Sequence, residues 1–224
     1  MTDCCAPNGL DAVFDESIAQ GDLRRYRQRG PDANTRHIVR ALAEQGLAEA
    51  SVLEIGGGVG ALHLELLKAG AECATAIELS PAYLAAGQAL AAQLGFSGAV
   101  QHRLMNFAER AAEVAPADIV VMNRVVCCYP DMPALVRPAA ERARNLLALA
   151  FPRDVWWLRL GARAQHLWAS LTGGAFRFFV HPAASILALA RQAGLTPIFE
   201  RRSIPWHIVV FRRRADSALL ARDG

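Results

Sequence analysis

A glycine-rich turn after a short apolar run is the feature of this chain with the clearest chemical meaning. The run 51–56 leads into glycines that let the backbone turn tightly and approach a flat or charged ligand, because glycine has no side chain in the way. These glycines are Gly56, Gly57, Gly58 and Gly60. Their spacing alone fits both a dinucleotide fingerprint and the turn that binds another adenosine cofactor.

Two acidic residues help to choose between these ligands. Glu54 stands two residues before Gly56, where its charge disfavours a pyrophosphate and suits a cationic ligand. Glu78 ends the next apolar run, 22 residues after Gly56, where a carboxylate can accept hydrogen bonds from a ribose diol. We therefore expect the turn to hold a cationic adenosine compound.

Two further polar residues belong to the same pattern: Asn106 follows the apolar run 99–105, and Asp118 lies at the start of the run 117–122. Together with the E-x-G-x-G-x-G turn and Glu78, they resemble the class I S-adenosylmethionine-dependent methyltransferases over residues 50–212. The resemblance implies S-adenosylmethionine as cofactor, with its methionine part at Glu54 and the glycines and its ribose at Glu78. It further implies contacts of the adenine with Leu79, Asn106 and Phe107, and of the sulfonium with Asn123.

A narrower likeness concerns the magnesium-protoporphyrin IX methyltransferase group. Three motifs follow that group's order: Phe14-Asp15, Tyr129-Pro130 and Phe151-Pro152-Arg153. The chain departs from the group's pattern at Val13 and Cys128, where that pattern has tyrosine and histidine. Because proton-handling side chains are expected there, we predict that magnesium protoporphyrin is a poor acceptor. The favoured reaction is O-methylation of a small, partly apolar molecule.

Methyl transfer from a sulfonium is an in-line displacement, which enzymes accelerate largely by aligning the reacting groups. A hydroxyl or amine acceptor also needs a base, whereas a carboxylate or thiolate does not. Tyr129 and His181 are the candidate proton-handling or orienting groups, and His166 is a weaker one. His63, on the helix after the glycine turn, is expected at the surface. Tyr26 lies in a basic run that is either a solvated face or a lid.

The cysteines leave another possibility open. Cys127 and Cys128 follow the fourth apolar run, where class I methyltransferases receive their acceptor, and alternation lets at most one side chain face the site. They are either small buried residues or, with Cys4-Cys5, soft ligands for a thiophilic substrate such as a metalloid. Five cysteines in this arrangement match no zinc site or disulfide framework, which predicts reduced thiols and a cytoplasmic protein.

The segments that must position these residues alternate between strand and helix. Strand patterns occur at 51–56, 73–79, 99–105, 117–122, 145–151, 196–203 and 206–212. Helix patterns occur at 32–46, 60–69, 82–94, from Asp131 onward and at 182–193, with Asp32 and Ser80-Pro81 as helix starts. We predict an α/β fold, a doubly wound, Rossmann-like and mostly parallel seven-stranded sheet that ends in an antiparallel hairpin.

The division of the chain follows from these patterns. Residues 1–48 are expected to form an N-terminal helical extension or lid, residues 49–214 the methyltransferase domain, and residues 215–224 a tail. The insertion 153–181 holds three of the four tryptophans. It is either a helix packed on the body or an aromatic cap that lines the acceptor pocket. Its apolar stripe consists of Trp157, Leu160, Ala164, Trp168 and Leu171.

Composition excludes several classes of protein. With 53% hydrophobic and 20% charged residues the chain can bury a core, so it is not disordered. No apolar window is long enough to span a membrane. The first residues have no basic start and no apolar segment, so they are not expected to act as a secretory signal. A net charge of +3 is too small to indicate a nucleic-acid partner. Residues 123–126 read N-R-V-V, where an N-P-P-Y or D-P-P-Y motif would have favoured a nucleic-acid substrate. Two alternatives stay open: an NAD-dependent oxidoreductase, and a non-catalytic protein that binds a cofactor or metalloid.

Overall fold

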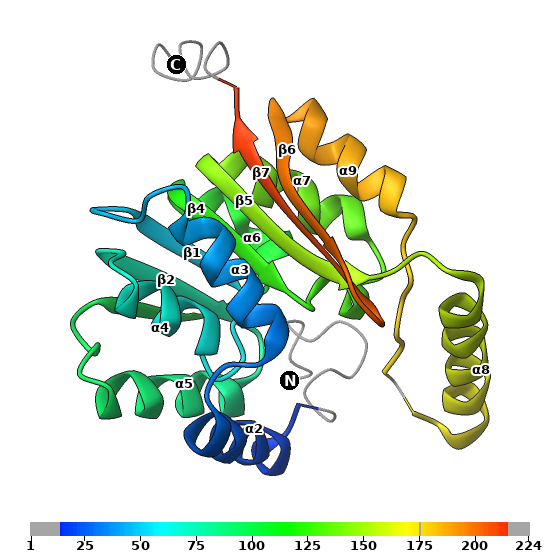
Figure 1. Cartoon of the computed structure of the whole chain (residues 1–224). Coiled ribbons are helices and arrows are strands. Elements are labelled where there is room, and N and C mark those ends of the chain that lie inside the picture. The colour runs from blue at the N-terminus through cyan, green and yellow to red at the C-terminus, as the bar shows by residue number, and fades with distance from the viewer. Residues whose placement is uncertain (1–13, 175, 215–224) are drawn as a thin grey trace.

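The strands of the computed structural model, which describes residues 14–174 and 176–214, form one seven-stranded sheet (Figure 1). They are β1 (Ser51–Ile55), β2 (Cys73–Glu78), β3 (Val100–Leu104), β4 (Ala117–Asn123), β5 (Ala143–Pro152), β6 (Leu195–Arg202) and β7 (Trp206–Arg213), in the order β3-β2-β1-β4-β5-β7-β6. The first five are parallel, and β7 pairs antiparallel with both β5 and β6. The predicted sheet with its C-terminal antiparallel hairpin is confirmed.

Helices cover both faces of the sheet (Figure 1). One face carries α3 (Ala33–Ala43), α4 (Ala61–Lys68) and α5 (Pro81–Gln93), and the other carries α6 (Phe107–Arg110), α7 (Met132–Arg142) and α9 (Ala183–Gln192). Successive strand residues enter opposite cores, as Val52 and Leu53 do, because strand side chains alternate. Two more helices complete the described chain: α2 (Glu16–Arg29) packs on α5, and α8 (Trp156–Thr172) stands to one side of the sheet.

Capping residues set where the helices begin. The Ser80 hydroxyl accepts a hydrogen bond from the Tyr83 amide (3.3 Å), and Pro81 occupies the first turn of α5. The Asp32 carboxylate accepts from the Thr35 amide (2.8 Å) at the start of α3. Both starts agree with the sequence prediction.

The parallel strands bring their carboxyl ends to one edge, where the glycine turn lies. After β3 the chain crosses to β4 on the other side of β1, so the strand order reverses between β1 and β4. In open α/β sheets the crevice at such a reversal is the usual ligand site. Ile55, Glu78 and Asn123 end the three strands that border it.

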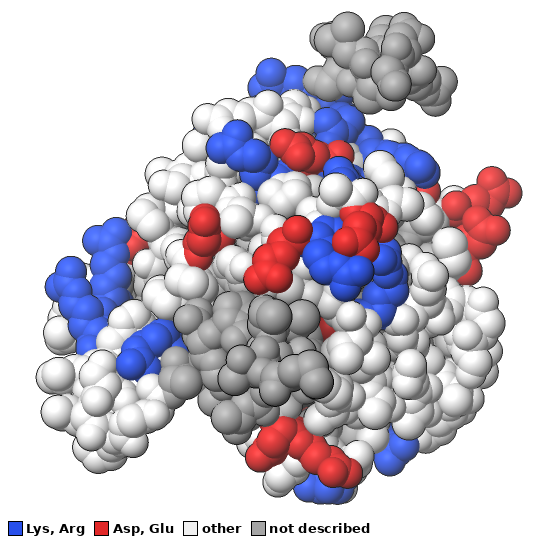
Figure 2. Space-filling model, turned by 180° about the vertical axis from the view of Figure 1, so that it is seen from behind, with Lys and Arg blue, Asp and Glu red and all other residues white. Residues whose placement is uncertain are grey.

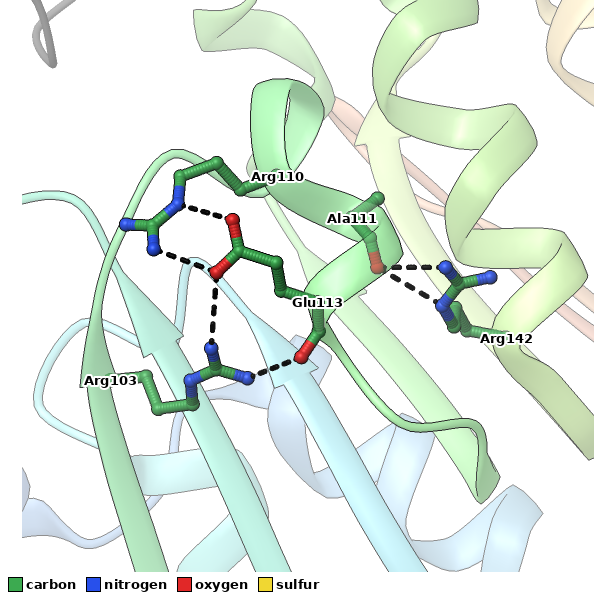
Figure 3. A network of polar contacts seen from close by, with 5 residues as sticks. All are labelled: Arg103, Arg110, Ala111, Glu113 and Arg142. Atoms are coloured by element: carbon green, nitrogen blue, oxygen red, sulfur yellow. Dashed lines mark hydrogen bonds and ion pairs between the residues drawn. The ribbon is translucent and has the colours of Figure 1, made fainter.

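A group of arginines fixes the loop that follows β3. The carboxylate of Glu113, in the short helix η2 (Ala111–Glu113), accepts from the Arg110 guanidinium at 2.7 and 2.8 Å (Figure 3). Arg103 of β3 donates to the Glu113 carbonyl (3.0 Å), and Arg142 of α7 donates to the Ala111 carbonyl (2.8 Å). These bonds tie the loop to a strand and to a helix.

The structure differs from the sequence prediction after β4. Residues 126–128 form a short helix, η3 (Val126–Cys128), rather than extended chain, so strand alternation does not govern the two cysteines there. The remaining predicted features that concern Val13, Cys4-Cys5 and the tail 215–224 lie outside the described residues.

Candidate functional site

A cavity of about 340 Å³ opens at the carboxyl ends of β1, β2 and β4. Most residues predicted to bind the cofactor line it: Glu54, Gly56, Gly57, Gly58, Glu78, Leu79, Asn106, Phe107 and Asn123. Gly60 does not. Of the three predicted catalytic residues, Cys128 and Tyr129 line the cavity and His181 does not.

The glycines are required by the backbone of the turn. Gly56, Gly58 and Gly60 have φ values of +68°, +55° and +82°, which side chains disfavour. A Cβ at Gly56 would lie 2.5 Å from Val125 Cγ2, and one at Gly60 would lie 2.6 Å from His63 Cε1. At Gly58 the nearest atoms lie 3.5 Å away, in the Tyr83 ring. Gly58 is therefore free of close neighbours on the side where a side chain would be.

Glu78 is held by the backbone around the turn. Its carboxylate accepts hydrogen bonds from the amides of Gly58 (2.8 Å), Leu79 (2.8 Å) and Ser80 (3.0 Å). Burial raises the pKa of Glu78, and these hydrogen bonds only partly oppose that shift. A carboxylate offers about four acceptor positions, so the group can still accept from a ligand hydroxyl.

Glu54 is paired with a residue that we expected at the surface. His63 is 1% exposed, and its Nδ1 lies 2.6 Å from Glu54 Oε2, which also accepts from the His63 amide (3.1 Å). The prediction for His63 was wrong because α4 is buried on nearly all sides; Leu62, Leu64 and Leu66 are each at most 1% exposed. Glu54 is therefore fixed under the glycine turn.

The side of the cavity nearest β4 carries polar groups from two elements. The Asn123 amide donates to the Thr35 hydroxyl of α3 (3.3 Å), and its Oδ1 is buried with no partner among the residues described. The Arg124 guanidinium contacts the Asp32 carboxylate at 2.5 Å and lies 5.8 Å from the centre of the Trp206 ring. The first turn of α3 therefore closes this wall.

The two cysteines of η3 differ in their surroundings. Cys127 is buried and its thiol donates to the Arg124 carbonyl (3.3 Å), whereas Cys128 lines the cavity. Their sulfur atoms lie 3.9 Å apart. The hydrogen bond between the two thiols lowers the pKa of Cys128 and raises that of Cys127, and burial raises the latter further.

His181 contacts the site only through the backbone. Its Nε2 donates to the Tyr129 carbonyl (2.9 Å), and its ring stacks on Phe179 at 5.8 Å. Burial lowers its pKa. His166 Nε2 donates to the Phe178 carbonyl (2.8 Å) and, like His181, does not line the cavity. Both histidines hold chain segments in place.

The N-terminal helix α2 forms part of the cavity wall. The Tyr26 hydroxyl donates to Glu65 (2.5 Å) and accepts from Lys68 (3.0 Å), so α2 is fixed to α4. The Tyr83 hydroxyl donates to Asp22 (2.6 Å), which fixes α2 to α5. Burial and, to a lesser extent, this hydrogen bond raise the pKa of Tyr83. Tyr26 is 9% exposed and lines the cavity, so its side chain is not part of a solvated face.

The tryptophan-rich helix is not a cap over this cavity, contrary to one expectation. None of its described residues lines the cavity. Trp157, Leu160, Trp168 and Leu171 of the predicted stripe are between 40% and 76% exposed, so the helix is not packed through that stripe either. From the segment after α8, the ring of Phe176 lies 6.0 Å from that of Phe14, which lines the cavity, but Phe176 itself does not line it.

Comparisons with known proteins agree with this geometry. A family model described as a methyltransferase domain matches residues 23–199. Magnesium protoporphyrin IX methyltransferase from Synechocystis, crystallised with bound SAH, superposes with a TM-score of 0.70 at 18% identity, over 91% of this chain and 99% of that chain. A search of curated protein sequences finds no significant match.

Two further solved structures share the fold. An O-methyltransferase family protein from Burkholderia thailandensis gives a TM-score of 0.67 at 18% identity, over 88% of this chain and 59% of that chain. The CcbJ methyltransferase from Streptomyces caelestis gives 0.63 at 19% identity, over 90% and 98% of the two chains.

The fold, the glycine turn and the cavity at the strand reversal define the class of the protein, a class I S-adenosylmethionine-dependent methyltransferase, as the sequence predicted. The chain belongs to the methyltransferase-domain family, whose model covers most of its length. This membership favours methyl transfer over the NAD-dependent alternative.

Proposed function

We propose that this cavity binds S-adenosylmethionine and passes its methyl group to a small, partly apolar acceptor, with oxygen as the favoured accepting atom. The observation that carries the proposal is the meeting, in one cavity, of the glycine turn, the Glu78 carboxylate and side chains from η3. We further propose, from the cysteine pattern of the sequence, that the protein is cytoplasmic.

The residues on the donor side fit this cofactor. Its sulfonium supplies a methyl group that is electrophilic enough to be attacked by oxygen. The open side of Gly58 allows a ligand to approach the backbone, and Glu78 accepts hydrogen bonds from the ribose hydroxyls. Glu54, held by His63, provides a negative charge for the cationic methionine part. Phe107, 3% exposed, supplies an apolar surface for the adenine.

The acceptor side supports a small molecule with an anionic oxygen. The cavity volume is at the low end of the range of about 300–1,000 Å³ for small-molecule sites, so little space remains beside the donor. Arg25 and Arg124 both line the cavity and attract a carboxylate or phenolate. Each is already paired with an aspartate, Asp22 or Asp32, which an anionic acceptor has to displace.

Tyr129 is the proposed group in contact with the acceptor, and His181 is a positioning residue for it. Tyr129 lines the cavity, and its carbonyl accepts the hydrogen bond from His181 Nε2. Because Nε2 must carry the proton in that bond, His181 cannot remove an acceptor proton through this nitrogen. An acceptor that is already ionised needs no base. The protein then contributes to catalysis by aligning the acceptor with the methyl group and by excluding water.

The test combines calorimetry with a product assay. We expect the full chain to bind S-adenosylmethionine and not NAD, and to methylate carboxylates or phenols from a panel with a labelled donor. We expect magnesium protoporphyrin in the same panel to be a poor acceptor. Donor binding without any methylated product would favour the non-catalytic alternative, and tighter binding of NAD would overturn the proposal.

A second candidate acceptor class rests on Cys128. Its thiol lines the cavity with a lowered pKa, and a second sulfur lies 3.9 Å away, which suits a thiophilic acceptor such as a trivalent arsenical. If arsenicals alone are methylated and Cys128→Ser abolishes their turnover, this class replaces the oxygen acceptor. If Cys128→Ser leaves turnover of all compounds unchanged, the thiols only fill space.

A further inference from the structure

Helix α8 has its apolar face toward solvent. Six large apolar side chains, three near each end of the helix, are 40–76% exposed: Trp156, Trp157, Leu160, Leu167, Trp168 and Leu171. At 100° per residue they occupy one continuous face of the helix, about 120° wide. Stripes of this kind normally face a protein core.

The inward face of α8 is small and polar instead. Ala162 and Ala169 are its buried residues, and Gln165 donates to the Phe176 carbonyl (3.0 Å). His166 donates to the Phe178 carbonyl on the same side. These bonds hold the inward face of the helix against residues 176–178. The apolar face is therefore kept pointing away from the protein.

Basic residues border the outward face. The insertion 153–181 contains four arginines, Arg153, Arg159, Arg163 and Arg177, and a single acidic residue, Asp154, which is paired with Arg159 at 2.5 Å. In the view from behind, the lobe at the lower left, where α8 lies, is mostly uncharged surface with basic side chains beside it (Figure 2). An anionic surface therefore complements this helix.

The size of the face favours a bilayer over a second copy of the chain. A helix of 17 residues is about 25 Å long and about 10 Å wide, which gives a strip of about 250 Å². A stable protein interface buries about 800 Å² on each partner. An interfacial helix needs only to sink its apolar face about 5–10 Å into the headgroup region, where tryptophan is favoured.

We propose that α8 is an interfacial membrane-binding helix, which places its outward face in the headgroup–acyl boundary of a bilayer that contains anionic lipid. The helix lies on such a surface and does not cross it; in the described part of the chain no helix is long and apolar enough to span a membrane. This inference goes beyond the proposed methyl transfer and does not depend on it.

The experiment mixes the full chain with vesicles of phosphatidylcholine alone or with phosphatidylglycerol, and measures co-sedimentation and tryptophan fluorescence. Three of the four tryptophans are in α8, so we expect a blue shift and quenching by brominated lipid. The double variant Leu167→Glu/Trp168→Glu should weaken binding at least about tenfold because two apolar side chains are lost. Arg163→Glu should weaken binding to anionic vesicles more than about fivefold, because it removes one cationic charge and adds an anionic one.

Matched variants separate the helix from general surface effects. Ile198→Glu on β6, where the side chain is 40% exposed, and Arg191→Glu on α9 should leave vesicle binding unchanged. Calorimetry with S-adenosylmethionine checks that the cavity is intact in every variant, which keeps this inference separate from the proposed function. Absence of vesicle binding by the wild type would overturn the inference. So would a lipid-free dimer, seen by light scattering, that the double variant dissociates.

Discussion

His63 and Glu54 form a buried pair, with 2.6 Å between Nδ1 and Oε2, directly beneath the glycine turn. A Cβ at Gly57 would lie 3.3 Å from the Glu54 carboxylate, and one at Gly60 would lie 2.6 Å from the His63 ring. The turn therefore lies on this pair, and the position of the cavity floor depends on a side chain that does not itself line the cavity.

Replacing His63 should cost stability. Loss of one partner from a buried pair leaves the other uncompensated, and we expect His63→Ala to reduce the free energy of unfolding by about 3–5 kcal/mol. Urea unfolding measures this change. His63→Gln, which keeps a donor, should recover part of the loss, and His37→Ala on α3 should have little effect. A change below about 1 kcal/mol for His63→Ala would show that the pair is not important for stability.

Replacing Glu78 should weaken cofactor binding. Glu78→Ala removes a charged acceptor from two ribose hydroxyls, which should cost about 1–3 kcal/mol of S-adenosylmethionine affinity in calorimetry. Glu72→Ala is the matched control, because Glu72 is exposed at the opposite end of β2. Equal affinities of wild type and Glu78→Ala would remove Glu78 from the site.

The same carboxylate should make cofactor affinity depend on pH. Burial raises the pKa of Glu78, so the folded protein protonates it at a higher pH than the unfolded chain does. Its contribution to stability is therefore present below its ordinary pKa and is lost as the pH rises through the raised value. Binding needs the ionised form, so affinity should fall as the pH falls through the raised pKa. Glu78→Gln should bind weakly with no such dependence; an identical pH profile would contradict the assignment.

Substitutions of Gly58 distinguish backbone strain from a side chain that blocks the approach of the cofactor. At φ +55° an L-residue costs about 1–2 kcal/mol, and Gly58→Ala should lose that stability and also bind S-adenosylmethionine more weakly. Gly58→Val should bind none. Gly46→Ala is the control, since Gly46 also has a positive φ and open space around it but lies away from the cavity. Normal cofactor binding by Gly58→Val would mean that the turn has only a structural role.

Truncation of Trp168 should leave catalysis in solution unchanged. One interpretation of the sequence was that this helix lines the acceptor pocket, but Trp168 is 69% exposed and outside the cavity lining. We therefore expect Trp168→Ala to keep the KM of a water-soluble acceptor and the urea midpoint of the wild type. A raised KM with unaltered cofactor affinity would restore the original prediction.

Local signals predicted the fold well because the elements of this chain depend on neighbours in sequence. Ser80-Pro81 and Asp32 start helices through bonds to residues three positions away. The glycine turn could likewise be predicted, because the backbone after β1 takes positive φ angles that glycine adopts most easily. Most of the residues predicted to bind the cofactor do line the cavity, although they are a minority of its lining.

The rest depends on contacts between distant residues, which no local pattern contains. The partners of Tyr26 are 39 and 42 residues away, so the sequence could not decide between a solvated face and a lid for this residue. The environment of His63 depended on how completely α4 is covered by other elements. The stripe of α8 was visible as a pattern, but a pattern does not show which side of a helix meets the protein.

Helix α3, near the N-terminus, packs against β7, the last strand of the chain, so this contact can form only at the end of synthesis. The ribosome adds β7 more than 150 residues after it has added α3. At about 5–20 residues per second this interval lasts roughly 10–30 s. During that time Ile38 and Leu42, which are fully buried in the finished molecule, have no final packing partner on that strand. The part of α3 that faces β7 therefore stays uncovered until synthesis is nearly complete, although α4 and β5, which also pack on α3, are made earlier.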